Sequence, residues 1–239
     1  MNPPKIIAIE TSGRRGSVAL ATGPELVGQR VFSADTDHAR DLLPEADRLC
    51  REHGWQPGDI AQCHLSIGPG SFTGLRVAVT FARHLALASG AMLCAVPTLD
   101  VIAENCVRIE QPPPHLAVIL DAKRGQVFAA VFSLEGGLYR RTVEAQMADP
   151  AEVFAAAPLP TAVVGEGIEY HRAAVEASGA EVLDRALWWP SAAGVHQVGW
   201  RMACAGEFTE PTHLIPHYLR RPEAVELWEK RHGTDREQN

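Results

Sequence analysis

Residues 7–20 read IAIETSGRRGSVAL, and residues 118–132 read VILDAKRGQVFAAVF. Both stretches follow one plan: an apolar run, an acid, a polar bend that contains Arg-Gly, and a second apolar run. Two apolar runs around a glycine-containing bend are typical of a β-hairpin. The same hairpin at two places in the chain predicts a duplicated domain.

Helical patterns follow the first hairpin. Residues 41–53 carry apolar side chains at helical spacing ahead of Gly54, which stands where a C-terminal cap belongs. Residues 63–67, CHLSI, then lead through a glycine-rich turn into a second apolar segment that ends near Gly90. Strand pairs that alternate with helices, twice over, predict an α/β chain of two similar lobes, and such folds usually bind ligands between the lobes.

A proline-rich segment separates the two halves. Residues 111–114, QPPP, cannot continue a helix, because proline nitrogens donate no hydrogen bond and each proline restricts the residue before it. We therefore predict a first lobe at residues 1–108 and a second at residues 109–239. The tail from about residue 207 is a candidate to pack back on the first lobe.

The composition is that of an ordinary globular chain. Of 239 residues, 46% are hydrophobic and 21% are charged, which is enough apolar material for a core. The formal charge of −7 disfavours an autonomous nucleic-acid binder, which needs basic residues to neutralise phosphates. Five cysteines without a C-x-x-C pair fit a reducing compartment, and no apolar run approaches the roughly 18 residues of a membrane span. We expect a cytoplasmic protein with no membrane contact.

Residues 68–74, GPGSFTG, join a predicted strand to a predicted helix. Glycines permit close backbone approach there, and the free N–H groups at the start of the helix can hold an anion. The turn is not a Walker A loop, because no Lys-Ser/Thr pair ends it and Arg76 is the nearest cation. A tight connection that needs glycine only for its geometry is an equally weighted alternative.

Both hairpin bends carry charged residues. Glu10 and Asp121 follow the first strand of each hairpin, where they could orient a metal-bound phosphate, although acids at strand ends more often form turns or face solvent. Exposed turns also carry cations routinely, so solvent contact is the leading expectation for the four basic residues of the bends, with a phosphate or an acidic partner as the alternative. These four residues are Arg14, Arg15, Lys123 and Arg124.

One pair of histidines has a spacing that can bind metal. His213 and His217 form H-x-x-x-H, which serves metal when both side chains face one way on a helix. Pro216 lies between them and the surrounding sequence is extended, so the spacing does not bring them together. We predict no metal site here.

The specific motifs resemble the TsaB (YeaZ) family in order and spacing. They are IAIETSGRRGSVAL, HARDLLP (38–44), SIGPGSFTGLRVAVTFARHLA (66–86), AVPTLDVIA (95–103), LDAKRGQVFAAVF (120–132) and PHYLR (216–220). The resemblance implies an actin-like (ASKHA, RNase H-like) fold of two lobes, each a mixed sheet with flanking helices. It also implies a non-catalytic scaffold, which supports a TsaD-type paralogue in building threonylcarbamoyladenosine on tRNA.

The same resemblance implies partners and a cleft. The expected partners are a TsaD-type transferase, a TsaE-type ATPase and a second copy when the chain is alone, with tRNA reached only through the complex. No cofactor is firmly expected, and ATP or ADP with magnesium in the assembled complex is left open. The candidate nucleotide-cleft residues are Glu10, Thr11, Ser12, Gly68, Gly70, Asp121 and Gly165.

A residue-level comparison separates this chain from its catalytic paralogue. TsaD-like chains carry a metal-binding H-x-x-x-H just after the strand that follows the glycine-turn helix. Here the two ligand positions hold Thr98 and Ile102, of which isoleucine cannot coordinate a metal and threonine seldom does. We therefore expect no catalytic metal and no catalytic residue.

Two helices are the predicted partner surface. They begin near Asp41 and Thr73 and match the pair with which family members pack against TsaD or a second TsaB. The second helix is apolar around most of its circumference, which predicts an interface, unless both faces are buried within the chain. The candidate interface residues are Leu42, Leu43, Leu75, Arg76, Val79, Arg83 and Leu85.

Two other functions compete with the scaffold. The first is an independent nucleotide hydrolase or a glycoprotease-like enzyme working in the interlobe cleft, for which Glu10 and Asp121 are the only candidate acids. The second is direct tRNA binding, which the net charge disfavours. Its local basic patch would comprise Arg14, Arg15, Arg220 and Arg221.

Overall fold

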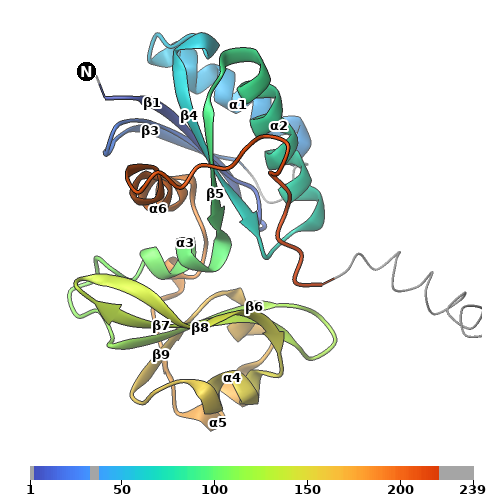
Figure 1. Cartoon of the computed structure of the whole chain (residues 1–239). Helices are drawn as coiled ribbons and strands as arrows, with labels where there is room; N and C mark the ends of the chain where they lie inside the picture. The colour runs from blue at the N-terminus through green and yellow to red at the C-terminus, as the bar shows by residue number, and fades with distance from the viewer. Residues whose placement is uncertain (1–2, 33–37, 221–239) are drawn as a thin grey trace, which may run out of the picture.

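The computed structural model describes residues 3–32 and 38–220, which form two five-stranded mixed sheets, one above the other in Figure 1. The first sheet has the order β3 (Glu25–Phe32), β2 (Gly16–Thr22), β1 (Lys5–Glu10), β4 (Ile60–Gly68) and β5 (Met92–Pro97). The second has the order β8 (Leu138–Ala148), β7 (Val127–Glu135), β6 (His115–Asp121), β9 (Thr161–Val164) and β10 (Glu181–Val182).

The two sheets share one topology. Strand β1 pairs antiparallel with β2 and parallel with β4, and β6 pairs in the same way with β7 and β9. The β1–β2 and β6–β7 pairs are the two predicted hairpins, so the α/β class with two similar lobes is confirmed. The central strands are almost wholly buried, because layers of the chain cover both faces of each sheet.

Helices follow the strands in both halves. They are α1 (His38–Glu52), α2 (Phe72–Ser89), α3 (Thr98–Glu104), α4 (Pro150–Ala156), α5 (Arg172–Ser178) and α6 (Ala192–Cys204). Ser71 caps the start of α2, because its Oγ accepts a hydrogen bond from Gly74 N–H at 3.2 Å. The helix ends before Gly90, as predicted, and this glycine caps it in the left-handed conformation with φ 74°.

The first sheet is covered on both faces. Helices α1 and α2 pack on one face and α6 packs on the other (Figure 1). Small residues such as Ala8 and Ala19 line the α6 side, which lets this helix approach closely. Helix α3 contacts α6 as well as β6 and β8, so it lies between the two sheets.

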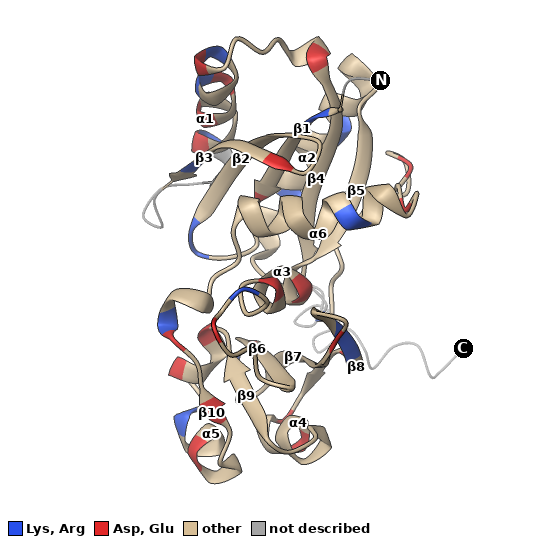
Figure 2. Cartoon of the chain, turned by 90° about the vertical axis from the view of Figure 1, so that its left-hand side faces the viewer, with Lys and Arg blue, Asp and Glu red and all other residues tan. Residues whose placement is uncertain are grey.

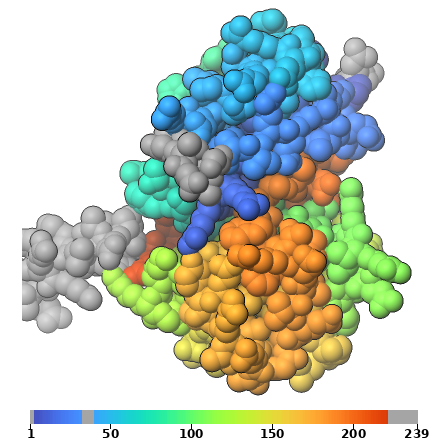
Figure 3. Space-filling view, turned by 180° about the vertical axis from the view of Figure 1, so that it is seen from behind, coloured from blue at the N-terminus to red at the C-terminus, as the bar shows by residue number. Residues whose placement is uncertain are grey.

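The chain returns to the first sheet near its end. Helix α6 belongs to the predicted second unit, residues 109–239, yet it contacts β1, β2, β4 and β5. Beyond α6, Thr209 N–H donates to Leu93 O at 2.8 Å, and Leu214 is 1% exposed within the first core. Figure 3 shows orange residues of this late segment against the blue first lobe. We call residues 207–220 the tail segment.

Charged residues occur on the surface of both lobes. Figure 2 shows basic residues on α1 and also in loops at the level where the two sheets meet. Within residues 3–32 and 38–220, no helix combines the length and the apolar character needed to cross a membrane.

Candidate functional site

A cleft of about 770 Å³ lies where the two lobes meet. Most of its wall comes from the β1–β2 bend, the turn before α2, the β6–β7 bend and the end of the tail segment, and further residues, among them Thr98 and Glu166, complete it. Its size falls within the roughly 300–1,000 Å³ of ordinary small-molecule sites.

The two turns of the first lobe meet through a close backbone contact. Ser71 N–H donates to Ser12 O at 2.7 Å. A Cβ atom on Gly70 would lie 2.4 Å from the same oxygen, which no side chain could tolerate. Both Ser12 and Gly70 line the cleft, as predicted for the candidate set. Glycine at position 70 is therefore explained by backbone geometry.

Two other glycines of the candidate set serve backbone contacts outside the cleft wall. Gly68 has φ 115°, and a Cβ there would lie 2.8 Å from His217 O in the tail segment. Gly165 has φ 111°, and its Cβ would lie 2.1 Å from Ile119 O in β6. Both positions combine a positive φ with close packing, which only glycine accommodates. Neither residue is part of the cleft lining.

Glu10 is buried beneath the cleft and engaged by serines. Its side chain is 0% exposed. One carboxylate oxygen accepts from Ser12 N–H and Ser12 Oγ, both at 2.5 Å, and the other accepts from Ser66 Oγ. Burial raises the pKa of Glu10, and these hydrogen bonds oppose that rise. Thr11 is also buried and donates to Gly74 O at 2.8 Å, so it ties the bend to α2.

Asp121 lines the cleft but is already paired. Lys123 Nζ lies 3.0 Å from one carboxylate oxygen, and His171 Nε2 lies 3.4 Å from the other. Burial raises the pKa of Asp121, but hydrogen bonds from Lys123 outweigh it, so this pKa lies below its ordinary value. Asp121 is therefore an ionised carboxylate whose charge is balanced by a neighbouring lysine.

The carboxylates of Glu10 and Asp121 do not fit the coordination of a resident magnesium ion. Magnesium takes oxygen ligands in octahedral geometry, through carboxylates that remain available to it. Both oxygens of Glu10 accept hydrogen bonds, and Asp121 is paired with Lys123. Across residues 3–32 and 38–220, no three His, Cys, Asp or Glu side chains gather as a metal site would require.

The basic tips of both bends reach the cleft. Arg14, Lys123 and Arg124 line it, whereas Arg15 does not. Arg220 joins them from the tail segment, where its Nη1 donates to Ala122 O at 2.8 Å. The sequence favoured ordinary solvent-facing charges, because nothing in it placed the two bends opposite each other. Arg221, which was grouped with these cations, lies outside the described residues.

The position that holds a metal ligand in TsaD-like chains is part of this cleft. Thr98 lines the cleft at the start of α3 and is 1% exposed. Its hydroxyl oxygen has no hydrogen-bond partner among the described residues. Ile102, one turn later, is 0% exposed and packs in the core of the second lobe.

The predicted interface residues of α1 and α2 divide by exposure. Three of them are at most 6% exposed: Leu42 and Val79, which belong to the first core, and Leu75, which lines the cleft. Leu85 also packs against this core and Arg83 is half-buried. Leu43 is 63% exposed and Arg76 is exposed. Most of the apolar surface of α2 is therefore buried within the chain, which is the alternative that the sequence left open to a surplus interface face.

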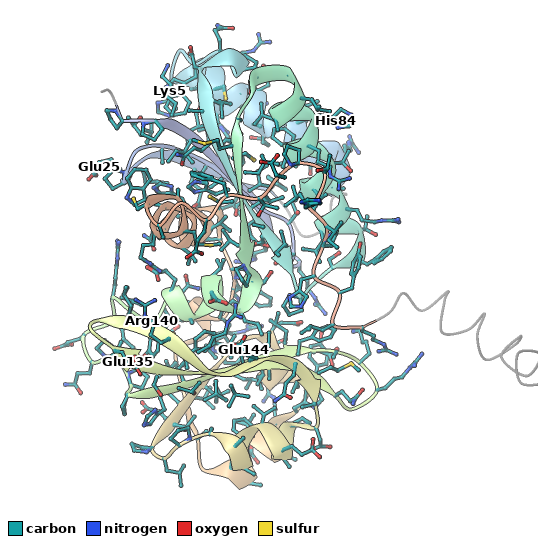
Figure 4. The ribbon with its side chains drawn as sticks, viewed as in Figure 1. Lys5, Glu25, His84, Glu135, Arg140 and Glu144 are labelled. Carbon is teal, nitrogen blue, oxygen red and sulfur yellow. The ribbon has the colours of Figure 1, made fainter. Side chains whose placement is uncertain are left out.

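The tail segment contacts α2 at two of the helix's side chains. Arg83 donates to Thr212 O at 3.3 Å, and the Phe72 and Tyr218 rings lie 5.1 Å apart. His84, on the opposite side of α2, points away from the body of the molecule (Figure 4). No periodic pattern in the tail signals this packing, so sequence analysis left its position open.

The chain is similar in sequence to a family of tRNA-modification proteins. The family model described as "TsaD: tRNA N6-adenosine threonylcarbamoyltransferase" matches residues 32–224. A Bacillus subtilis protein named tRNA threonylcarbamoyladenosine biosynthesis protein TsaB is 27% identical, over 93% of this chain and 97% of its own length. An Escherichia coli protein of the same name is 27% identical over 97% of this chain and 100% of its own.

Two solved structures are similar to this chain in both fold and sequence. YeaZ from Pseudomonas aeruginosa has a TM-score of 0.77 at 26% identity, covering 90% of this chain and 100% of that structure. A second Pseudomonas aeruginosa structure, described as similar to peptidase YEAZ, has a TM-score of 0.78 at 27% identity, covering 91% and 100%.

Proposed function

Since the chain belongs to the family that the TsaD model describes, and within it to the TsaB (YeaZ) branch of the actin-like superfamily, we propose that it is a non-catalytic subunit of tRNA threonylcarbamoyladenosine formation. Its role is to bind and support a TsaD-type catalytic paralogue. The pathway is the one for which the similar proteins are named, and the residues of the cleft support the non-catalytic role.

The engagement of Glu10, beneath the cleft, and of Asp121, in its wall, is the observation that supports the non-catalytic role. A hydrolase needs a carboxylate that is available to hold a metal or to activate water. Both carboxylate oxygens of Glu10 accept hydrogen bonds, from Ser12 and Ser66, and the charge of Asp121 is balanced by Lys123. At the positions of the paralogue's metal ligands stand Thr98 and Ile102. The nucleotide-hydrolase and glycoprotease-like alternatives find no support in this arrangement.

The partner surface that remains is the outer side of α1 and α2. The two helices lie side by side and contact each other (Figure 1). Leu43 on α1 and Leu87 on α2 are 63% and 81% exposed, and Arg76 is exposed near the start of α2. Exposed leucines on two adjacent helices suit a protein partner better than solvent alone.

The same surface is proposed for a second copy when the chain is alone. A TsaE-type ATPase would then join the assembled complex. The tRNA would also bind through the complex, because the chain itself carries a formal charge of −7. A cytoplasmic location follows from the proposed tRNA substrate.

Co-purification tests this proposal. The chain and its cognate TsaD-type protein would be mixed, and the mass in solution compared with that of the chain alone. We expect a one-to-one complex that Leu43→Glu weakens at least tenfold. The matched control is Leu159→Glu, since Leu159 is 77% exposed in the second lobe, away from α1 and α2. Unchanged affinity of Leu43→Glu would refute the surface, and peptide or ATP hydrolysis by the chain that Asp121→Asn abolishes would refute the non-catalytic role.

A further inference from the structure

Helix α3 packs into both lobes at once. It lies between the two sheets, and six of its seven residues are buried. Leu99, Ile102 and Ala103 belong to the core of the second lobe. Val101 packs instead with α6 and with strands of the first sheet. A helix held in this way cannot move with one lobe without losing its packing against the other.

The two acids of α3 pair with different layers of the molecule. Asp100 pairs with Arg141 of β8, in the second lobe, whose Nε donates to it at 3.0 Å. Glu104, one turn later, pairs with Arg201 of α6, which covers the first sheet. The two carboxylate side chains are 27% and 5% exposed. Partly buried ion pairs are screened less by salt than surface pairs, so α3 is tied by charge to each lobe.

The chain crosses between the lobes twice, and Asn105 joins the two crossings. The first crossing is α3 with residues 105–114, and the second is residues 187–191, which lead into α6. Asn105 Nδ2 donates to Leu187 O and to Trp189 O, both at 2.9 Å. Hinges in two-lobed proteins are a few residues whose backbone angles can change. Here the residues at which a hinge would form are hydrogen-bonded to one another.

Two further contacts bridge the lobes away from α3. Arg14, in the β1–β2 bend, donates to Tyr170 Oη in the second lobe. Arg220, at the end of the tail segment, donates to Ala122 O in the second lobe at 2.8 Å. The tail segment is itself anchored on the first lobe and runs down beside α2, away from α6 (Figure 1). Ties at several separate places oppose rotation about more than one axis.

We propose that these contacts form an interlobe brace, which holds the two lobes at one fixed angle. The brace consists of α3 with its two ion pairs, Asn105, and the bridging contacts of Arg14 and Arg220. Many two-lobed proteins close around a ligand by bending at a hinge, and the brace prevents such a movement here. The chain therefore behaves as one rigid body. A partner that touches both lobes would lose less conformational entropy on binding it than on binding two mobile lobes.

Pulsed electron spin resonance of the full chain tests the brace, because it measures distances between two spin labels. Cys204, at the end of α6, is exposed and takes the first label, whereas the other four cysteines are buried. Ala177→Cys, on the exposed side of α5, takes the second label in the second lobe. We expect one narrow distribution of distances. Arg51→Ala is the charge-matched control and should leave the distribution unchanged, because Arg51 pairs with Asp47 within α1.

Removing parts of the brace should free the lobes. Asn105→Ala combined with Arg141→Ala should at least double the width of the distance distribution, since both the joined crossings and the ion pair of β8 are lost. Arg220→Ala alone should widen it to a smaller extent. A broad or two-peaked distribution in the otherwise unchanged chain would overturn the proposal. A combined variant no broader than Arg51→Ala would overturn it as well.

Melting curves separate a freed lobe from an unfolded one. If the combined variant does not fold, Arg220→Ala decides in its place, because this change leaves both hydrophobic cores intact. A wider distribution in folded Arg220→Ala supports the brace, and a width equal to that of Arg51→Ala contradicts it.

Discussion

His217 N–H donates a hydrogen bond to Ile67 O across 2.7 Å, which joins the tail segment to β4 of the first sheet. The next residue of β4 is Gly68, whose α-carbon packs against His217 O. The late part of the chain is therefore built into the first lobe beside the cleft and α2. The stability of this junction is open to direct measurement.

Gly68→Ala should destabilise the protein. The new Cβ would lie 2.8 Å from His217 O at a φ of 115°, so the strain should lower the free energy of unfolding by about 1–3 kcal/mol. Gly58→Ala is the control, because nothing lies within 4 Å of its Cβ. Urea unfolding of both variants checks this, and equal stabilities would show that the junction yields without cost.

Leu214→Ala should detach the tail segment from the core. Leu214 is 1% exposed, so its truncation should cost about 2–5 kcal/mol of unfolding free energy. Ile215→Ala is the adjacent control, since Ile215 is 67% exposed, and should cost less than about 0.5 kcal/mol. Thermal melts of the pair separate a packed tail from a loose one, for which both changes would be small.

Acidification should weaken the fold through His64. Burial, with a smaller contribution from the His196 ring stacked 5.9 Å away, lowers the pKa of His64 to about 3. The unfolded pKa of histidine is about 6.5, so the unfolded state binds the extra proton between these values. The stability contributed by neutral His64 is therefore complete above about pH 6.5 and is lost as pH falls toward 3.

Unfolding free energies measured from pH 7 to pH 4 check this prediction. The wild type should show a slope that His64→Gln reduces by up to about 1.4 kcal/mol per pH unit. His84→Gln is the exposed control and should keep the wild-type slope. Parallel slopes for wild type and His64→Gln would contradict it.

Arg201→Ala should destabilise the contact between α3 and α6. Arg201 donates to both oxygens of Glu104, at 2.9 and 2.5 Å, and the Glu104 side chain is only 5% exposed. Removing the arginine leaves a buried carboxylate unpaired, which should cost about 2–4 kcal/mol, since Arg201 itself is 39% exposed. Arg51→Ala, which breaks an exposed pair with Asp47, should cost less than about 1 kcal/mol. If denaturation shows similar losses of unfolding free energy for Arg201→Ala and Arg51→Ala, the Arg201–Glu104 pair contributes no more to stability than a surface ion pair.

Local patterns predicted the hairpins and the end of α2. Residues 7–20 and 118–132 became β1–β2 and β6–β7 because apolar runs around glycine bends suit antiparallel pairing in any context. Gly90 ended α2 for a similarly local reason. These features depend on neighbours in sequence, which is why one sequence was enough.

The candidate site was predicted less completely. Ser12, Gly70 and Asp121 line the cleft, but Gly68 and Gly165 hold backbone contacts with distant segments. Glu10 turned inward because two serines satisfy its carboxylate, one of them 56 residues away on β4. Such partners cannot be read from local patterns.

The sequence by itself determined the duplicated α/β plan, since periodicity and turn chemistry act over a few residues. Only the tertiary structure decided which cations meet in the cleft and which face of α2 stays exposed. Arg14 and Lys123 are more than a hundred positions apart, and the tail segment reaches α2 from the far end of the chain. Their meeting depends on how two folded sheets and a late helix pack. Local sequence patterns are compatible with several such packings, and the burial of distant segments against one another selects one of them.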